Sequence, residues 1–395
     1  MNNKEMDKRI RERKGVIMNF KLTEEQELIR QNMRDFAKTY VDPIAAEIDE
    51  NSRYPEEVFK RLGEMGWMGM PFPAEYGGGG IEYTTYSMAI EELSRSCAAT
   101  GFTLQVHVMG TTPIFLYGTD EQKKKFDAPL CKGGGLSCFS VTEPGAGTDM
   151  GAATTTADKV GNEYVLNGTK TFASNGPNAE TYVIFALTDK SAGPKGMSAF
   201  IVPRGTPGLK VGGHFMKMGL RASQTSELIL KDCRIPQENL LGAEGEGTKI
   251  AMASFDHGRI AIAAQSVGIA QAALDESISY SKQRIQFNKP ISRNQAIQWM
   301  IADMATEVQA GRFMYLYAAW LKDQGLPFSK EASMAKLWCA EMCNRHTSKA
   351  VQIHGGYGYC KGFKVERLMR DAKITEIYEG TSEAQRMIVA NSILR

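Results

Sequence analysis

The residue best placed to act as a base is Glu379, close to the C-terminus. It follows an apolar run that should hold the backbone in the interior, and a glycine then breaks this run: Ile374, Ile377, Tyr378 and Gly380. Thr381 or Ser382 can cap the helix predicted to follow, with Gln385 at capping-box spacing from Ser382. The sequence thus predicts a non-helical hinge from which the Glu379 carboxylate can project into a cavity and remove a proton. Alternatively, this carboxylate only favours the positive end of the helix.

Three glycine-containing turns carry polar side chains that could bind a ligand. They lie at residues 141–149, 167–176 and 352–358. Glycine lets backbone N–H groups approach a ligand closely, and Thr and Ser hydroxyls can both donate and accept hydrogen bonds. Each turn alone is typical of a structural loop, but the three together with a hinge glutamate indicate a ligand site.

Other common cofactor and nucleophile sites have no support in the sequence. It contains no GxGxxG opening a helix after a strand, no GxxxxGK[ST], no HExxH, no Cys/His cluster at zinc spacing and no GxSxG. The glycine run at residues 77–80 lacks a following Lys-Ser or Lys-Thr, so we predict a loop there. His354, beside Gly355 and Gly356, could be a base or a structural histidine in a turn that ends a helix. We therefore expect neither a Rossmann site nor a P-loop, and no metal.

The elements that must position these residues change in type along the chain. Helical periodicity with an N-cap at Thr23 predicts an α-helical domain over residues 18–132. Short β-rich runs separated by turn residues predict an all-β sandwich or barrel over residues 133–247. These runs are residues 163–166, 181–187, 198–202, 209–211 and 226–230.

Long helical periodicity returns after the β-rich part. It covers residues 250–284, 294–324 and 329–353, and a short helix follows Gly380. Small residues line one stripe of the first run, namely Ala261, Ala263, Ala264, Gly268 and Ala272. Residues 248–395 should therefore form a four-helix bundle, and the whole chain a multidomain α+β protein.

Composition sets the broad class. The chain has 395 residues and a net charge of +2, which is typical of a soluble globular protein and not of a nucleic-acid binder. Its seven cysteines contain no CxxC, so we predict reduced thiols and a cytoplasmic location. No apolar run approaches the ~18 residues that suggest a membrane span. Residues 1–17 are rich in Lys and Arg without a long apolar core, and we predict a disordered extension or an expression remnant.

Four motifs, in order along the chain, carry a family resemblance. They are Val-Thr-Glu-Pro-Gly-Ala-Gly-Thr-Asp at 141–149, Arg284-Ile-Gln286-Phe287 with Gln295, Gln352-Ile-His-Gly-Gly-Tyr-Gly, and Ile377-Tyr378-Glu379-Gly380-Thr381-Ser382. On these residues the chain resembles the acyl-CoA dehydrogenase family from Leu22 to Arg395. The resemblance implies an N-terminal α-helical domain, a middle β domain and a C-terminal four-helix bundle.

The resemblance also implies a homotetramer, built as a dimer of dimers, with FAD between the β domain and the C-terminal bundle. The residues that would line the isoalloxazine and ribityl chain are Phe139, Val141, Thr142, Gly147 and Thr148. Phe172 and Ser174 would cover its other side. The residues that would hold the pyrophosphate and adenine, partly across a subunit interface, are Arg284, Gln286, Phe287, Gln295, Gln352 and Gly356. Thr381 and Glu383 would touch FAD just after the catalytic loop.

By the same resemblance, Glu379 would remove the α-proton of an acyl-CoA thioester while the β-hydride leaves to flavin N5. The flavin ribityl 2′-hydroxyl and the backbone N–H of Glu379 would stabilise the enolate-like charge. Electrons would pass to electron-transfer flavoprotein. Some members carry the base on the first long C-terminal helix instead, but the matching position here is Gly258, which has no side chain.

Substrate recognition also follows from the resemblance. Arg259 resembles the arginine that organises the active site and the CoA end, or it forms a salt bridge on the helix face. Further substrate contacts would come from Asp256, Tyr378 and Gly380. The pair Gly258-Arg259 with a terminal-loop base looks most like the short-chain, butyryl-type branch. Gly101 stands where glutaryl-CoA enzymes place an arginine, which predicts an uncharged acyl tail.

Two residues depart from the family pattern. Phe172 replaces the usual tryptophan against the flavin, and Asn288 replaces the usual glycine after Phe287, which puts the local turn in question. Neither removes a catalytic group, and both leave open an enoyl-CoA reductase with a dedicated electron-transfer flavoprotein. An acyl-CoA oxidase is a further alternative, although oxidases usually carry a long extra C-terminal domain and this chain stops at Arg395. A flavin- or thioester-binding scaffold without turnover is the alternative from another class.

Overall fold

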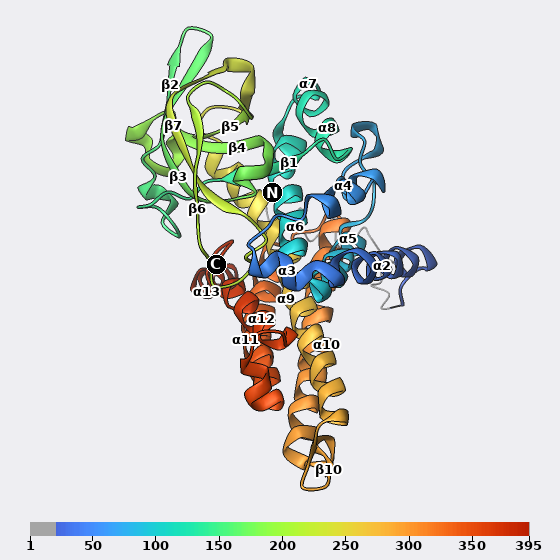
Figure 1. Ribbon diagram of the computed structural model, residues 1–395. Helices are drawn as coiled ribbons and strands as arrows, with labels where there is room; N and C mark the ends of the chain where they lie inside the picture. The colour runs from blue at the N-terminus through green and yellow to red at the C-terminus, as the bar shows by residue number, and fades with distance from the viewer. Residues whose placement is uncertain (1–20, 395) are drawn as a thin grey trace.

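The computed structural model describes residues 21–394 and shows helices, then a β domain, then helices again (Figure 1). In Figure 1 the β domain lies above the long C-terminal helices, and the N-terminal helices lie beside the junction of the two. The predicted fold class is confirmed. The predicted extension, residues 1–17, lies outside the described residues, and the domain boundaries at 132/133 and 247/248 stay predictions.

The N-terminal helices surround a buried central helix. They are α2 (Glu24–Phe36), α3 (Ala45–Glu50), α4 (Glu56–Glu64), α5 (Tyr83–Ser96), α6 (Ala98–Tyr117), α7 (Asp120–Gln122) and α8 (Ala128–Cys131). The predicted cap of the first is confirmed, because the Thr23 hydroxyl accepts a hydrogen bond from the Gln26 N–H and the Gln26 side chain accepts one from Thr23. Helix α6 packs against α5, α9 and β1, so all its residues from Ala98 to Ile114 are buried.

The β domain is one eight-stranded mixed sheet. Its strands are β1 (Leu136–Ser140), β2 (Thr156–Val160), β3 (Glu163–Ser174), β4 (Ala179–Leu187), β5 (Met197–Pro203), β6 (Leu209–His214), β7 (Thr225–Pro236) and β8 (Leu240–Leu241). The order is β6-β7-β3-β2-β4-β5-β8, and β1 pairs in parallel with β4. All five predicted runs lie within strands. Strands β1 and β2 were not predicted because they are short and partly polar, and β8 was not predicted because it has only two residues.

The C-terminal part is built on one long helix, α9 (Gly247–Gln283), against which α10 (Gln295–Asp323) and α11 (Ser329–His354) pack. Between α9 and α10 lies a small hairpin, β9 (Ile285–Gln286) with β10 (Lys289–Pro290). Two shorter helices, α12 (Lys364–Lys373) and α13 (Ser382–Leu394), pack on α11. The small residues on α9 are buried as predicted, and a Cβ at Gly268 would come within 2.3 Å of the Glu91 carbonyl on α5.

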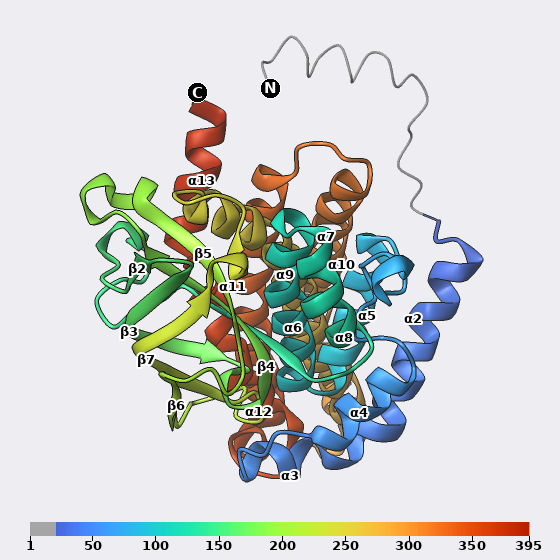
Figure 2. The ribbon, with the colours of Figure 1, turned by 90° about the horizontal axis from the view of Figure 1, so that it is seen from above.

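Viewed from above, α6 and α9 run side by side between the sheet and α5, with α11 behind them (Figure 2). This arrangement brings α6, α9 and α11 together near the chain that leads into α13. Residues from three helices that are far apart in sequence therefore surround Glu379.

Two details of the predicted hinge are wrong. Ile377 is half exposed, because the 3-10 turn Ile374–Glu376 directs it outward while Thr375 is buried. The Ser382–Gln385 capping box does not form: Thr381 Oγ1 accepts from the Ala384 N–H instead, and the Gln385 side chain turns back to the hinge carbonyls.

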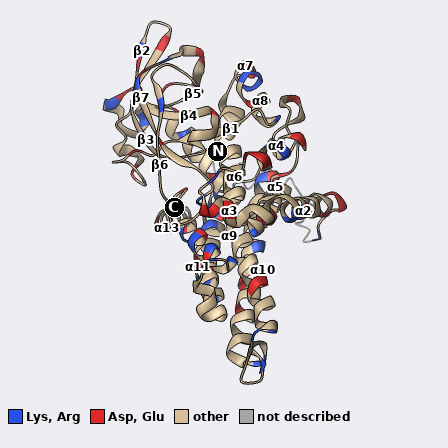
Figure 3. Ribbon diagram, in the orientation of Figure 1, with Lys and Arg blue, Asp and Glu red and all other residues tan. Residues whose placement is uncertain are grey.

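The surface carries both signs of charge, with Lys and Arg interspersed among Asp and Glu over the helices and the β domain (Figure 3). Between residues 21 and 394, no helix is at once long and apolar enough to cross a membrane.

Candidate active site

The hinge at Glu379 has an unusual backbone. Glu379 has φ 51° and Gly380 φ 93°, so two consecutive residues adopt left-handed conformations. A glutamate in this region costs on the order of 1 kcal/mol, which the surrounding contacts must offset. Lys336 Nζ donates to the Gly380 carbonyl at 2.7 Å, and Gln385 Nε2 donates to the same carbonyl at 2.9 Å. Two side chains from α11 and α13 thus hold the strained turn.

The same turn exposes a backbone donor. Gln385 Nε2 also lies 3.3 Å from the Glu379 carbonyl, so both hinge carbonyls are bonded. The Glu379 N–H makes no hydrogen bond to any residue in the range 21–394. A free N–H next to a carboxylate can stabilise negative charge on a bound oxygen.

The Glu379 carboxylate is buried between α6 and α9. Its Oε1 accepts a hydrogen bond from Gln105 Nε2 at 2.7 Å. Its Oε2 lies directly over Gly258, where a Cβ would come within 2.1 Å of it. Burial raises the pKa of Glu379 to about 7, although the Gln105 hydrogen bond and the charges of Lys336 and Arg259 act to lower it.

The predicted substrate residues gather around this carboxylate. Arg259 is buried and forms an ion pair with Asp256, which also accepts from Ser329 Oγ at 2.9 Å. The Tyr378 hydroxyl donates to Gln265 Oε1, and the Tyr378 ring stacks on Phe102 with centroids 4.7 Å apart. The Arg259 guanidinium is therefore an organised cation beside Glu379, as well as a member of a salt bridge.

The first predicted flavin-binding loop, residues 141–149, is anchored by a buried ion pair. Lys170 Nζ, on β3, donates to Glu143 Oε1 at 2.7 Å and to the Val141 carbonyl at 3.2 Å. Thr154 donates twice to Glu143 Oε2, through its N–H at 2.7 Å and its hydroxyl at 2.8 Å. The Thr171 N–H donates to the Thr142 carbonyl at 2.9 Å, so two of the predicted motifs meet directly.

The aromatic residues predicted to contact the flavin lie around this junction. Phe139 contacts Phe185 and, from α9, Phe255, with centroids 4.9 and 5.4 Å apart. Phe172 is 62% exposed, has φ 52° and lies 4.8 Å from the Phe215 ring. Because Phe255 and Gly258 are one turn apart on α9, about 4.5 Å along its axis, the loop and the base share one neighbourhood.

The predicted adenine and pyrophosphate residues lie elsewhere. Arg284, Gln286 and Gly356 line a cavity of about 500 Å³ beside the β9–β10 hairpin, together with Tyr280, Ile291, Ile353, His354, Gly355, Tyr357 and Cys360. The hairpin lies at the end of the helices that is remote from the β domain (Figure 1). Gln295 begins α10 next to it, whereas Gln352 does not line the cavity. One chain therefore does not bring all the predicted FAD residues together.

The hairpin itself explains one departure from the family pattern. Phe287 and Asn288 have φ 50° and 63°, and Lys289 pairs with Gln286. Asparagine tolerates the left-handed region better than other residues with a side chain, so it can replace glycine in this tight turn. Phe287 is 90% exposed at the tip.

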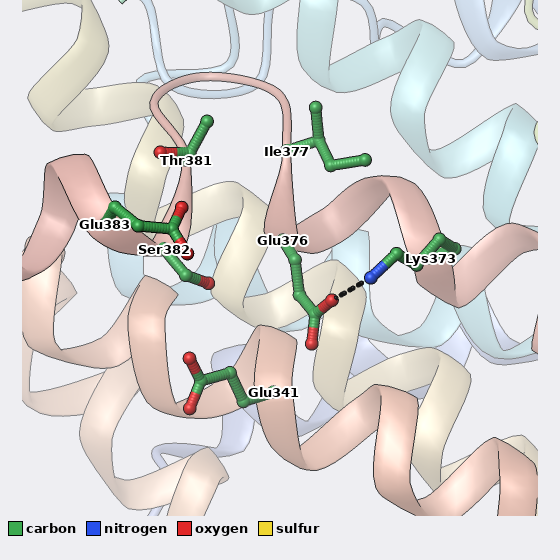
Figure 4. Close-up of a pocket in the computed structure, with 7 residues that line it drawn as sticks. All are labelled: Glu341, Lys373, Glu376, Ile377, Thr381, Ser382 and Glu383. Carbon is green, nitrogen blue, oxygen red and sulfur yellow. Dashed lines mark hydrogen bonds and ion pairs between the residues drawn. The ribbon is translucent and has the colours of Figure 1, made fainter.

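Thr381 and Glu383 line a smaller cavity of about 270 Å³ behind the hinge (Figure 4). Figure 4 shows its other walls, formed by Glu341, Lys373, Glu376, Ile377 and Ser382, with Lys373 bonded to Glu376 at 2.6 Å. Glu379 does not line this cavity, because its side chain points to the opposite side of the hinge, toward α6 and α9.

The residues in place fit FAD. Around Gly147, Gly355 and Gly356 a Cβ would meet nothing within 4 Å, so the backbone there is open to a ligand. Arg284 lies 5.5 Å from the Tyr357 ring, and its guanidinium suits a pyrophosphate next to an aromatic platform. Between residues 21 and 394, no group of three or more His, Cys, Asp or Glu side chains could hold a metal ion.

Comparison with protein families decides the relationship. Three models match, described as "Acyl-CoA dehydrogenase, N-terminal domain" over residues 23–134, "middle domain" over 138–233 and "C-terminal domain" over 245–394. The chain belongs to the acyl-CoA dehydrogenase family. It is accordingly an oxidoreductase of this family, and its cofactor is FAD.

Individual relatives cover nearly the whole chain. The "Acyl-CoA dehydrogenase, short-chain specific" of Clostridium acetobutylicum is 49% identical over 96% of this chain and 100% of its own length. The "Acryloyl-CoA reductase (NADH)" of Anaerotignum propionicum is also 49% identical, over 96% of each protein. A solved chain described under "Electron transferring flavoprotein of Acidaminococcus fermentans" is 47% identical with a TM-score of 0.95, covering 96% of this chain and 100% of that one.

The sequence did not predict which side chains hold Glu379 and the loop at residues 141–149. These are Gln105, Glu143, Lys170, Lys336 and Gln385, the last of which was expected only in a capping box. A weak signal existed for Lys336, which shares a helical stripe with Ala332, Cys339 and Cys343 and therefore had to be buried. Gln105 was likewise a single amide in a long apolar run.

Proposed function

We propose that the protein catalyses the FAD-dependent α,β-dehydrogenation of a short-chain, uncharged acyl-CoA thioester to the trans-2-enoyl-CoA. FAD, when bound by the residues named above, supplies the acceptor for the β-hydride. The contribution of the chain is to hold the thioester, remove its α-proton and stabilise the charge that develops.

The observation that carries this proposal is the state of Glu379. An α-proton of a thioester is far less acidic than a carboxylic acid, whose ordinary pKa is about 4.3 for Glu. The buried Glu379 has its pKa raised to about 7, so it is a stronger base than an exposed glutamate while still ionised in part at neutral pH. Lys336 and Arg259 favour the ionised form and keep it available.

The removed proton goes to Glu379, and the electrons it leaves behind need a counter-charge at the thioester oxygen. The free N–H of Glu379 provides one donor for that oxygen. Lys336 and Gln385 fix the backbone that carries this N–H. One residue thus supplies both the base and a charge-stabilising donor, and the left-handed turn sets the angle between them.

The cations around the base support an uncharged acyl tail. Arg259 is paired with Asp256, and Lys336 donates to Gly380, so both are engaged within the described residues. At Gly101 even a Cβ would come within 2.1 Å of Ser94 Oγ, which leaves no room for an arginine. A distal carboxylate on the substrate would therefore have no partner here. The short-chain relative from Clostridium supports the small size of the tail.

We further propose that the protein acts as a homotetramer and passes electrons to electron-transfer flavoprotein. The separation of the hairpin from the β domain supports assembly, because a partner subunit could bring its hairpin to the flavin loop. The Acidaminococcus chain supports the electron partner, since that structure concerns an electron transferring flavoprotein. A cytoplasmic location stays a prediction.

The reverse direction is the second candidate. The relative from Anaerotignum, 49% identical, is named a reductase of an unsaturated acyl-CoA. In that direction protonated Glu379 would return a proton to the α-carbon, and a pKa of about 7 suits donation as well as removal.

An anaerobic titration of the holoenzyme with butyryl-CoA, followed by flavin absorbance, tests the proposal. We expect prompt bleaching in the wild type. Glu379→Gln should retain bound FAD and thioester but reduce the flavin about 10³-fold more slowly. Glu331→Gln, at a partly exposed glutamate of α11 that pairs with Lys330, is the control and should behave as wild type. Bleaching only by longer or branched thioesters would reject the short-chain assignment, and unchanged reduction in Glu379→Gln would reject the base.

A further inference from the structure

Gln105 is a polar side chain in an otherwise apolar stretch of α6. It is 1% exposed, and its Nε2 lies 4.0 Å from the sulfur of Met109, one turn further along the helix. Burying an amide costs free energy unless it is hydrogen-bonded. Its Nε2 donates to Glu379 Oε1 at 2.7 Å, whereas its own buried Oε1 has no hydrogen-bond partner among residues 21–394. The position of the amide is therefore determined by the carboxylate, and that of the carboxylate by the amide.

The two oxygens of Glu379 are consequently not equivalent. Oε1 is bonded to Gln105, whereas Oε2 is buried and has no hydrogen-bond partner among residues 21–394. Oε2 lies over the backbone of Gly258, and a Cβ at that glycine would also meet the Met109 sulfur at 3.3 Å. The unbonded oxygen thus faces a glycine and a thioether, neither of which donates a hydrogen bond.

We propose that Gln105 is a positioning residue for the base: its amide N–H holds Oε1 of Glu379, so that Oε2 alone takes the α-proton. The inference rests on the proposed function, because it assigns a role relative to Glu379. It adds that the direction of proton removal is set from α6, at the opposite wall of the site from the hinge that carries the base.

The amide does more than fix a direction. A donor to a carboxylate favours its ionised form, and no other side chain in the described part of the chain donates a hydrogen bond to the carboxylate oxygens of Glu379. The charged groups that face Glu379 are Arg259 on α9, with its partner Asp256, and Lys336 on α11. Tyr83 and Tyr86 on α5, and Tyr378, complete the titratable surroundings and remain neutral because burial raises their pKa.

Two variants separate positioning from mere filling of space. Gln105→Leu keeps most of the volume but removes the donor, so the base should ionise at higher pH. Gln105→Glu keeps the shape and places a second carboxyl against Glu379, and two carboxyls sharing one site ionise with still greater difficulty. The pH midpoint of proton removal should therefore rise in the order wild type, Gln105→Leu, Gln105→Glu, with the first step about one pH unit.

The measurement is deuterium exchange into acetyl-CoA by the holoenzyme, followed by NMR between pH 5.5 and 9. Acetyl-CoA has α-protons but no β-carbon, so it reports proton removal without dehydrogenation. At pH 7 we expect exchange to fall about tenfold in Gln105→Leu, since the ionised fraction falls and the carboxylate loses its orientation. Thr111→Val, a buried isosteric change on the same helix whose hydroxyl bonds only His107, is the control.

Each other outcome has a defined meaning. Identical pH midpoints in the three proteins would overturn the proposal, even if rates or KM values changed, because Gln105 would then only fill the acyl cavity. A raised midpoint in Gln105→Leu with a wild-type midpoint in Gln105→Glu would also overturn it. If Glu379→Gln still exchanged acetyl-CoA protons, the proposed function itself would fail, which is a distinct result.

Discussion

Two glutamates with buried carboxylate oxygens, Glu143 and Glu379, have pKa values shifted in opposite directions. Glu143, within the predicted flavin-binding loop, accepts hydrogen bonds from Lys170, from both groups of Thr154 and from the Thr155 N–H. The carboxylate of Glu379, in the candidate active site, accepts one, from Gln105. Burial opposes ionisation of both, but the Lys170 charge and the hydrogen bonds lower the pKa of Glu143 to about 2, whereas that of Glu379 is raised to about 7.

The difference shows that the degree of burial alone does not determine the pKa of a carboxylate. The number and charge of its hydrogen-bond donors determine whether the pKa is lowered or raised. Both oxygens of the Glu143 carboxylate accept hydrogen bonds, so this carboxylate helps to hold its loop, because moving it would leave several donors without a partner. A carboxylate with one donor and one unbonded oxygen keeps a free position for a proton, and the protein holds the surrounding backbone through Lys336 and Gln385 instead. Variants at Glu143 and at Glu379, or at their neighbours, test the two carboxylates separately.

The largest effect should come from breaking the saturated site. Lys170→Met leaves Glu143 buried without its counter-charge, which should lower the free energy of unfolding by about 3–5 kcal/mol. Because the pair anchors residues 141–143, the FAD content should fall as well. Urea denaturation and the flavin-to-protein absorbance ratio measure the two effects. Lys159→Met, in an exposed pair with Glu244 at 3.9 Å, is the matched control and should change stability by less than ~1 kcal/mol.

The double variant Lys170→Met/Glu143→Leu sharpens the same test. It removes the stranded charge, so it should recover part of the lost stability relative to Lys170→Met alone. Wild-type stability in Lys170→Met would show that the buried Glu143 carboxylate does not need the Lys170 counter-charge.

Removing the carboxylate of Glu379 should have the opposite effect and raise the free energy of unfolding at high pH. Glu379 has a folded pKa near 7 and an unfolded value near 4.5, so the unfolded chain loses this proton first as pH rises. Its contribution is fully retained below about pH 4.5 and is lost progressively up to pH 7, by about 3 kcal/mol for a shift of this size. Glu379→Gln should remove that loss and be more stable than wild type at pH 8 but not at pH 4.5.

Thermal unfolding at pH 4.5 and pH 8 measures this gain, with Glu331→Gln at a partly exposed position of α11 as the control. A gain of equal size at both pH values would mean that burial of the charge is not its source. If Glu379→Gln were less stable than wild type at pH 8, the ionised Glu379 carboxylate would stabilise the fold, as that of Glu143 does.

The two glutamates also mark what the sequence could and could not predict. Periodicity placed the long helices and most strands, and the motifs placed Glu379 on a turn, because these are local properties. The β1 and β2 strands escaped, since residues such as Ser137 and Lys159 weaken the alternation. The partners of both carboxylates escaped for another reason: Lys170 and Glu143 are 27 residues apart, and Gln105 and Glu379 are 274 apart. Only folding brings such pairs together.

The unbonded Oε2 of Glu379 lies so close to the backbone of α9 that residue 258 must be a glycine. In Gly258→Ala the new Cβ would lie 2.1 Å from Oε2, so the carboxylate must rotate away from its bond to Gln105. We expect flavin reduction by butyryl-CoA to slow about 100-fold, since a base displaced by this much loses its alignment. The loss of stability should be small, because the preference of helices for alanine over glycine, up to ~1 kcal/mol, offsets part of the lost hydrogen bond to Gln105. Gly213→Ala, where a Cβ would meet nothing within 4 Å, should leave the rate unchanged.

The smallest effect should come from loosening the hinge rather than the base. Lys336→Met removes one of the two donors to the Gly380 carbonyl and leaves Gln385 in place. The left-handed turn should then persist in most molecules, but with the Glu379 N–H less well oriented, and we expect kcat to fall about tenfold with little change in KM. Stopped-flow reduction by butyryl-CoA measures this, with Lys330→Met on the surface of the same helix as the control.

Because burial lowers the pKa of Lys336 to about 8, the wild-type rate should also decline above pH 8 while that of Lys336→Met does not. A decline of equal size in both proteins would place the second titration elsewhere and leave Gln385 as the residue that holds the turn.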